Sequence, residues 1–107
     1  MATDAKHKLG LMLSTPPEHP NLSVLTGLAQ AAVERGDGVY LYLIDEGVRS
    51  LGDARIQALA RSGVKLFACA YGAQKHGLPT TDPAATWCGL VVLNDVIDGC
   101  DRFLSFN

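Results

Sequence analysis

The chain has 107 residues, of which 48% are hydrophobic, and its formal net charge is −2. This length allows one domain with a modest core, and the apolar fraction excludes a disordered chain. The negative charge argues against binding nucleic acids through their phosphates, and the apolar runs are too short to span a bilayer. Because residues Met1 to Lys8 are polar and do not resemble a signal peptide, we expect a cytoplasmic protein.

The first part of the chain predicts a strand, a helix and a second strand. Leu9 to Ser14 is a short apolar run, and the two prolines after it cannot continue a central strand. A helical stripe of apolar residues begins at Asn21, and Gly36 supplies a C-terminal stop. Val39 to Ile44 is continuously apolar, as expected of a parallel strand that is covered on both faces.

The middle of the chain predicts a second helix and a third strand. Asp53 is suited to cap the helix, which should end at Gly63. Val64 to Ala68 predicts the strand, and the small residues from Ala70 to His76 favour a short helix or turn.

The last part predicts one more helix and a closing strand. Asp82 and Pro83 suit a cap and first turn, and the helical stripe is clearest from Trp87 to Ile97. Gly99 can end this helix, and Arg102 to Phe106 reads as the final strand.

Alternating strands and helices predict a three-layer α/β/α sandwich with a mainly parallel sheet of four to five strands, formed by residues 1–107 as a single domain. In such sheets, functional residues gather beyond the carboxyl ends of the strands. The Ser14–Pro20 loop, the Asp45–Gly47 turn and Cys69 should therefore lie along one edge of the molecule.

Three widely spaced cysteines, Cys69, Cys88 and Cys100, should be reduced thiols, because a disulfide framework belongs to secreted chains. They form no CxxC pair, and His76 does not complete a zinc set, so we expect no metal site. Cys100 precedes the last strand and should lie at the opposite end of the sheet from Cys69, in a structural role. Cys88 is either structural or a second reactive thiol.

Cys69 is the best candidate for a reactive residue. It follows a buried strand and precedes a helical turn, whose free amide groups would stabilise a thiolate. Its small neighbours leave space for another reactant, although free cysteine is also common as a buried small hydrophobe. His76 could lend a pH-dependent positive charge nearby, and Glu18 and His19 could line the pocket from the first loop. The alternative for these three is an ordinary solvated surface.

Four segments resemble the DsrE/DsrF-like sulfur-relay family. The segment from Cys69 to Leu78, CAYGAQKHGL, resembles the cysteine motif of DsrE and TusD proteins, in which a glycine preceded by basic residues follows eight residues after the cysteine. The Ser14–Pro20 loop resembles the loop after the first strand of the family. Val39 to Val48 is similar to its extended strand followed by Gly-Val, and Gly89-Leu90 with Cys100–Phe106 is similar to its closing helix and strand.

This resemblance implies a sulfur carrier that holds sulfane sulfur as a persulfide on Cys69 and passes it between partners such as TusA-like carriers. It implies a homotrimer or hexamer, no cofactor, and a pocket to which Tyr71, Lys75 and His76 would belong. The family motif often has two arginines where this chain has Lys75 and His76, so a role that needs a bidentate guanidinium is in doubt.

Two other functions are compatible with the same fold. One is an oligomeric binding module that transfers no sulfur, and the other is a thiol redox sensor in which Cys69 is oxidised. Whether the chain acts as an enzyme is left open. A phosphate-binding domain is disfavoured, because the Ser14–Pro20 loop contains three prolines and no glycine.

Overall fold

The computed structural model describes residues 7–107, so most of the polar N-terminal segment, on which the expected compartment rests, lies outside the described residues. Within residues 7–107, five strands and five helical segments follow one another. In order, they are β1 (Lys8–Leu13), α1 (Asn21–Glu34), β2 (Gly38–Leu43), the 3-10 helix η1 (Asp45–Ser50), α2 (Ala54–Arg61), β3 (Lys65–Cys69), α3 (Ala70–Lys75), β4 (Thr86–Cys88), α4 (Leu90–Gly99) and β5 (Arg102–Phe106).

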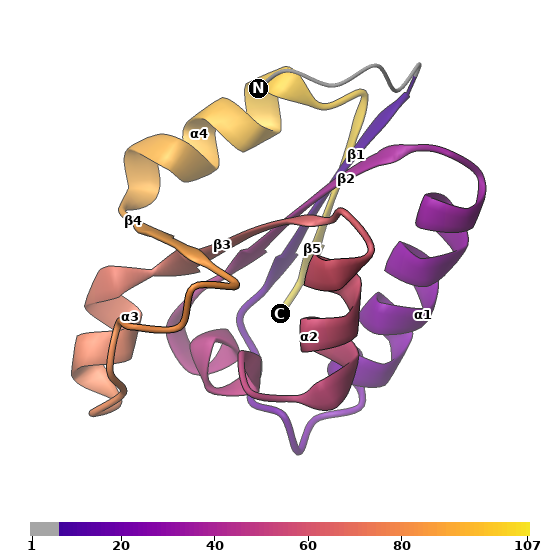
Figure 1. The fold of residues 1–107 in the computed structure, drawn as a ribbon. Coiled ribbons are helices and arrows are strands. Elements are labelled where there is room, and N and C mark those ends of the chain that lie inside the picture. The colour runs from indigo at the N-terminus through magenta and orange to yellow at the C-terminus, as the bar shows by residue number, and fades with distance from the viewer. Residues whose placement is uncertain (1–6) are drawn as a thin grey trace.

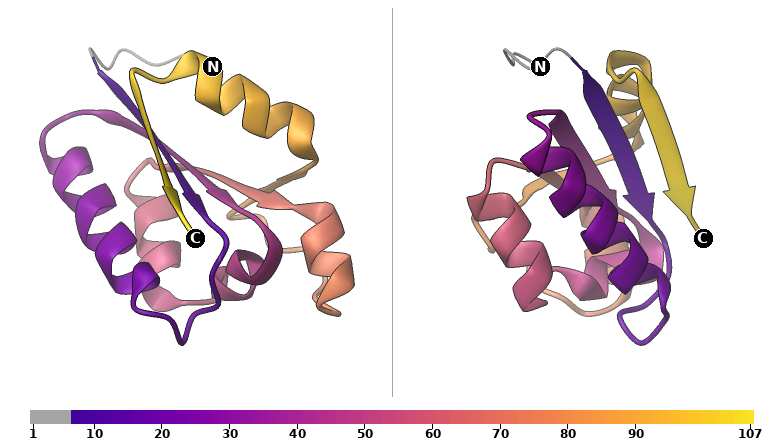
Figure 2. Two further views of the ribbon diagram at one scale, coloured as in Figure 1. Left: turned by 180° about the vertical axis from the view of Figure 1, so that it is seen from behind. Right: turned by 90° about the vertical axis from the view of Figure 1, so that its right-hand side faces the viewer.

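The strands form one sheet in the order β4-β3-β2-β1-β5, and every neighbouring pair is parallel. The chain therefore builds outward from β1 through β2 and β3 to β4, and then returns to place β5 on the other side of β1. Helices α1 and α2 cover one face, and α4 lies on the opposite face (Figures 1 and 2). The predicted α/β fold with a parallel sheet and helices on both faces is confirmed.

The two faces of the sheet carry different side chains, because successive residues of a strand point to opposite faces. A Cβ added to Gly10 would lie 3.3 Å from Val96 of α4, so Gly10 faces α4. Leu11 and Leu13 face the other way, toward α1, and are fully buried, as is Leu41 beside Leu11 in β2. Burial of each such leucine contributes about 1.5–3 kcal/mol, so this leucine layer is the main hydrophobic core.

The helix boundaries that the sequence predicted are close to those observed. Helix α1 begins at Asn21, and Gly36 takes a φ of 87°, a left-handed conformation that glycine adopts without strain. Asp53 caps α2, as predicted, because its carboxylate accepts the backbone N–H of Arg55 at 2.9 Å.

The prediction for residues 82–89 is wrong. Asp82 does not cap a helix. It accepts an amide hydrogen bond from Gln57 at 3.0 Å, and its carbonyl accepts the indole N–H of Trp87 at 3.2 Å. The Gln57 contact ties Asp82 to α2, residues 83–85 turn, and Thr86–Cys88 pairs with β3 as a short edge strand. The last helix accordingly begins only at Leu90.

Within residues 7–107, the helices lack the combination of length and apolar character that crossing a bilayer requires.

Candidate functional site

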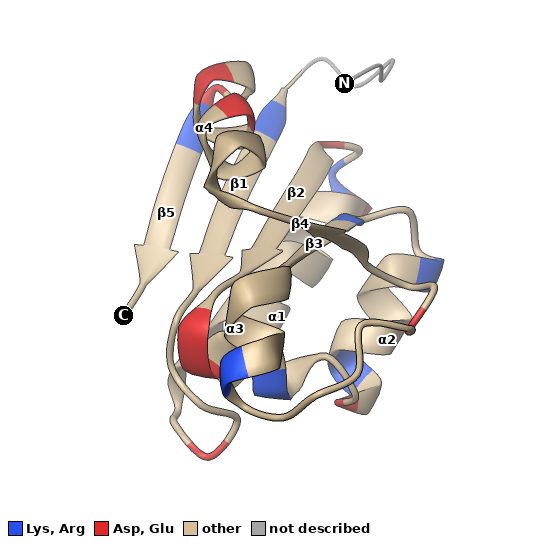
Figure 3. Cartoon of the chain, turned by 90° about the vertical axis from the view of Figure 1, so that its left-hand side faces the viewer, with Lys and Arg blue, Asp and Glu red and all other residues tan. Residues whose placement is uncertain are grey.

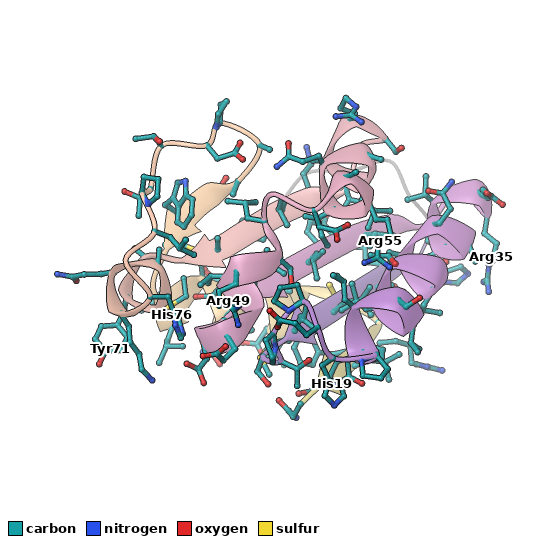
Figure 4. All side chains as sticks on the ribbon, turned by 90° about the horizontal axis from the view of Figure 1, so that it is seen from below. His19, Arg35, Arg49, Arg55, Tyr71 and His76 are labelled. Carbon is teal, nitrogen blue, oxygen red and sulfur yellow. The ribbon has the colours of Figure 1, made fainter. Side chains whose placement is uncertain are left out.

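The loops that the sequence placed together do lie at the carboxyl ends of adjacent strands. Strand β1 leads into residues 14–20, β2 leads into η1, and β3 leads directly into α3. Figure 4 views this edge from below, with Tyr71 and His76 toward one side, Arg49 at the centre and His19 toward the other.

Cys69 is the last residue of β3 and the N-cap of α3. Its Sγ accepts the backbone N–H of Gly72 at 3.4 Å, and the residue is 5% exposed. An N-cap side chain satisfies an amide that the helix leaves without a partner, and a sulfur that bears negative charge satisfies it better than a neutral thiol. This hydrogen bond fixes the position of the Cys69 Sγ at the start of α3.

A cavity of about 320 Å³ opens beside Cys69. Its walls come from the end of β2, from α3 and from the start of α4, with Ile44 and Leu90 as apolar surfaces. Tyr71 also lines the cavity and is itself 73% exposed, so it stands at the mouth, where Figure 4 shows it projecting outward. A small reactant or the tip of a partner chain could reach the sulfur by this route.

The basic residues of the motif face acidic residues of η1. Lys75 lies on the cavity wall, but its Nζ is 3.3 Å from the Asp45 carboxylate. The Lys75 ammonium, which hydrogen-bonds Asp45, keeps the pKa of that carboxyl below its usual value. The Nε2 of His76 lies 3.5 Å from Asp45 and from Glu46, and this side chain is only 16% exposed. Both side chains are therefore held against η1, and Figure 3 shows the two signs of charge side by side at this junction.

Glu18 and His19 lie away from the cavity. The Glu18 carboxylate pairs with Arg49 at 2.8 Å, and Arg49 also pairs with Glu46 at 2.9 Å, so the first loop is tied to η1. The Nδ1 of His19 accepts the backbone N–H of Asn21 at 3.0 Å at the start of α1. Both residues are exposed, and neither lines the cavity beside Cys69.

Cys88 lies next to Cys69. It is the last residue of β4, and the register pairs it directly with Cys69 across the two strands. The side chain is half-buried, and its Sγ contacts the carbonyl oxygen of Ala68 at 3.8 Å. Burial raises the pKa of the Cys88 thiol. Cys100, by contrast, lies just before β5 at the amino end of the sheet, as the sequence predicted. Its Sγ packs near Gly10.

Tyr42 belongs to the same cluster, although its apolar surroundings in the sequence indicated only a core aromatic. Its ring is buried, and its hydroxyl donates to the carbonyl of Gly89 at 2.8 Å. Burial, and then the proximity of Cys88 and Cys69, raises the pKa of this hydroxyl. Tyr42 is two residues before Ile44, so it shares the face of the sheet on which Ile44 lines the cavity, a relation that the sequence does not reveal without the cavity.

Within residues 7–107, no three histidine, cysteine or acidic side chains come together as ligands for a metal ion.

The comparisons with known proteins agree with one another. The model of the DsrE/DsrF-like family matches residues 7–106. The YchN protein from E. coli has a similar structure, with a TM-score of 0.78 and 18% identity over 94% of this chain and 98% of its own. A conserved protein of unknown function from Bacteroides thetaiotaomicron, BT1422, gives a TM-score of 0.69 and 19% identity over 99% and 100% of the two chains. No curated protein matches the sequence.

Proposed function

We propose that this chain, which belongs to the DsrE/DsrF-like family, carries sulfane sulfur as a persulfide on Cys69 and passes it to an acceptor protein thiol. The observation that carries the proposal is the position of Cys69 as an N-cap at the wall of an open cavity. A sulfur carrier needs a cysteine sulfur that a second sulfur compound can reach, and the cavity beside Cys69 supports such access.

The chemistry is two successive displacements at sulfur. In the first, the Cys69 thiolate attacks the outer sulfur of a donor persulfide, the donor sulfur–sulfur bond breaks, and the donor leaves as a thiolate. In the second, an acceptor thiolate attacks the outer sulfur of the Cys69 persulfide, and Cys69 leaves as a thiolate. The Gly72 N–H, 3.4 Å from Sγ, favours Cys69 as a leaving group in the second step. Neither displacement requires a cofactor.

The apolar rim suits a protein partner. Leu90 lines the cavity and is 61% exposed, and Val91 beside it is 78% exposed. Exposed apolar side chains that adjoin a site are typical of protein contact surfaces. We infer that TusA-like carriers bring donor and acceptor thiols to the cavity mouth at Leu90, and that the chain assembles as a homotrimer or hexamer through the exposed face of α4 from Val91 onward.

The test is intact-protein mass spectrometry after the reduced protein is exposed to polysulfide or to a persulfidated TusA-like carrier. The native protein should gain one or more sulfur atoms that a reductant removes, and Cys69→Ser should gain none. Cys100→Ser is the matched control, because Cys100 is also partly buried but lies at the opposite end of the sheet. This variant should gain sulfur as the native protein does.

Two results would contradict the carrier proposal. One is that neither the native protein nor Cys88→Ser gains sulfur, and the other is a Cys69→Ser variant that gains as much as the native protein. The exposed apolar face of α4 would then favour the binding module, which needs no reactive thiol.

A further inference from the structure

Cys69 and Cys88 occupy positions from which a disulfide bond can form. They are register partners in neighbouring parallel strands, so their side chains leave the sheet on the same face. Neighbouring strands lie about 4.8 Å apart. Disulfides join residues whose Cα atoms are about 4.4–6.8 Å apart, so this spacing is compatible with a bond between the two sulfurs.

The strand that carries Cys88 can adjust to bring the sulfurs together. Strand β4 has three residues, lies at the edge of the sheet and pairs only with β3 among the described strands. The Cys88 Sγ lies 3.8 Å from the Ala68 carbonyl oxygen, a weak contact that a rotation about χ1 would break. Rotation about χ1 of the two cysteines, with a small shift of an edge strand, is a minor rearrangement.

Tyr42 limits how far that strand can move away. Its hydroxyl donates to the carbonyl of Gly89, the residue that follows Cys88, at 2.8 Å. Because Tyr42 is buried in the central strand β2, this hydrogen bond ties the end of β4 to the rigid part of the sheet. Cys88 is therefore held beside Cys69.

We propose that Cys88 is the resolving thiol of Cys69, and that the two cysteines form a reversible intramolecular disulfide. A resolving thiol is one that displaces whatever sulfur compound has become attached to the first cysteine. This role gives Cys88 a chemical function and adds a dithiol–disulfide activity to the site.

The chemistry balances with a low-molecular-weight disulfide as the oxidant. The Cys69 thiolate attacks glutathione disulfide and forms a mixed disulfide, and one glutathione leaves. Cys88 then attacks the Cys69 sulfur of that mixed disulfide. The bond to glutathione breaks, the Cys69–Cys88 bond forms, and the proton lost by Cys88 passes to the departing glutathione. Two protein thiols are oxidised, and one glutathione disulfide is reduced to two glutathione molecules.

The same step applies to a persulfide, and this extension rests on the proposed function. Attack by Cys88 on the inner, Cys69 sulfur would release the outer sulfur as hydrosulfide and leave the Cys69–Cys88 disulfide. The sulfane sulfur is then reduced and the two thiols are oxidised, so no other oxidant is needed. Cys88 would thereby set how long the site can hold its sulfur.

The experiment treats the reduced protein with glutathione disulfide, quenches with acid, alkylates the remaining thiols and measures the intact mass. The native protein should fall from three alkylated cysteines to one, without retained glutathione, and its digest should contain a peptide pair joined through Cys69 and Cys88. Cys88→Ser should keep glutathione on Cys69, in an amount at least about tenfold above the native protein, because an internal thiol competes at a high effective concentration. Cys100→Ser should behave as the native protein does.

The proposal is overturned if the native protein retains glutathione on Cys69 as Cys88→Ser does, or if the linked peptide pair involves Cys100. Cys88→Ala serves as a second variant, and far-ultraviolet circular dichroism checks that both fold. The linked peptide is read from the native protein, so this outcome does not depend on a variant. Glutathione disulfide contains no sulfane sulfur, and failure of the polysulfide test would leave this result unaffected.

Discussion

At the scale of single residues, Gly47 shows why a small residue is needed near the site. A Cβ at this position would lie 2.7 Å from the carbonyl carbon of Leu13 and 3.3 Å from the backbone nitrogen of Ser14. Real Cβ atoms do not approach backbone atoms that closely, so η1 could not pack against the end of β1. Gly47 is thus required where η1 passes the end of β1.

Replacing Gly47 with alanine should therefore destabilise the fold. Because a backbone clash cannot be relieved by rotating a side chain, we expect the free energy of unfolding to fall by about 2 kcal/mol or more. Urea denaturation followed by circular dichroism measures this change. Gly52→Ala is the control, because Gly52 is exposed and a Cβ there would meet no atom within 4 Å. Equal stability of the two variants would contradict this account of Gly47.

At the scale of elements, α2 depends on its N-cap. The helix has eight residues, which is too short to be stable alone, and Ile56 and Leu59 are the side chains it buries. Asp53 accepts the Arg55 backbone N–H at 2.9 Å and pairs with the Arg55 guanidinium at 3.0 Å. The hydrogen bond from the Arg55 guanidinium is the main cause that lowers the pKa of the Asp53 carboxyl, and the Arg55 backbone N–H adds to it.

Asp53→Ala should lower the free energy of unfolding by about 1 kcal/mol, the usual cost of losing an N-cap. Asp53→Asn is the matched control and should lose less, because asparagine caps as well as aspartate does. The lowered pKa of Asp53 also makes its contribution to stability depend on pH. The ionised carboxylate stabilises the fold above the ordinary pKa of 3.8, and this contribution is lost as the pH falls through the lower pKa of the folded protein. Urea denaturation at several pH values measures this dependence. The deficit of Asp53→Ala should thus narrow at acidic pH, and a deficit that grows there would contradict the assignment.

The site around Cys69 also depends on contacts between α3 and η1. Helix α3 supplies the amide that bonds Cys69, and η1 holds the basic end of α3 through Asp45. The Lys75–Asp45 ion pair is exposed and contributes little to stability.

At the scale of the whole molecule, α4 exposes several large apolar side chains. Leu90, Val91 and Ile97 are 61%, 78% and 41% exposed, and the first turns of α4 carry no charged residue (Figure 3). Such an apolar surface on a 107-residue chain is costly in water. The proposed assembly would cover it.

The oligomer proposal predicts that the native protein elutes as a trimer or hexamer in size-exclusion chromatography with light scattering. Val91→Glu should reduce the mass, because an interface would have to bury the new carboxylate without a partner. Val24→Glu is the control, since Val24 is also an exposed valine, 59% exposed, but lies on α1 over the other face of the sheet. A monomeric native protein, or dissociation by Val24→Glu alone, would contradict an interface on α4.

The sequence by itself determined the fold class and the position of Cys69. Val39 to Ile44 is apolar throughout because its strand is covered on both faces, and Cys69 follows the next buried strand with small residues after it. These signals are local: each depends on a residue and its near neighbours in the chain, so they are legible without coordinates.

Only the tertiary structure decided which residues distant in the chain share the site with Cys69. Cys88 lies 19 positions along the chain, on a three-residue strand too short to show a periodic pattern, and Tyr42 reads as one more apolar residue of its strand. The structure also turned Glu18 toward Arg49 and away from the cavity. Strand register and ion pairs join residues that are distant in the chain. These contacts stabilise the protein only once the sheet has formed, so the local sequence does not reveal them.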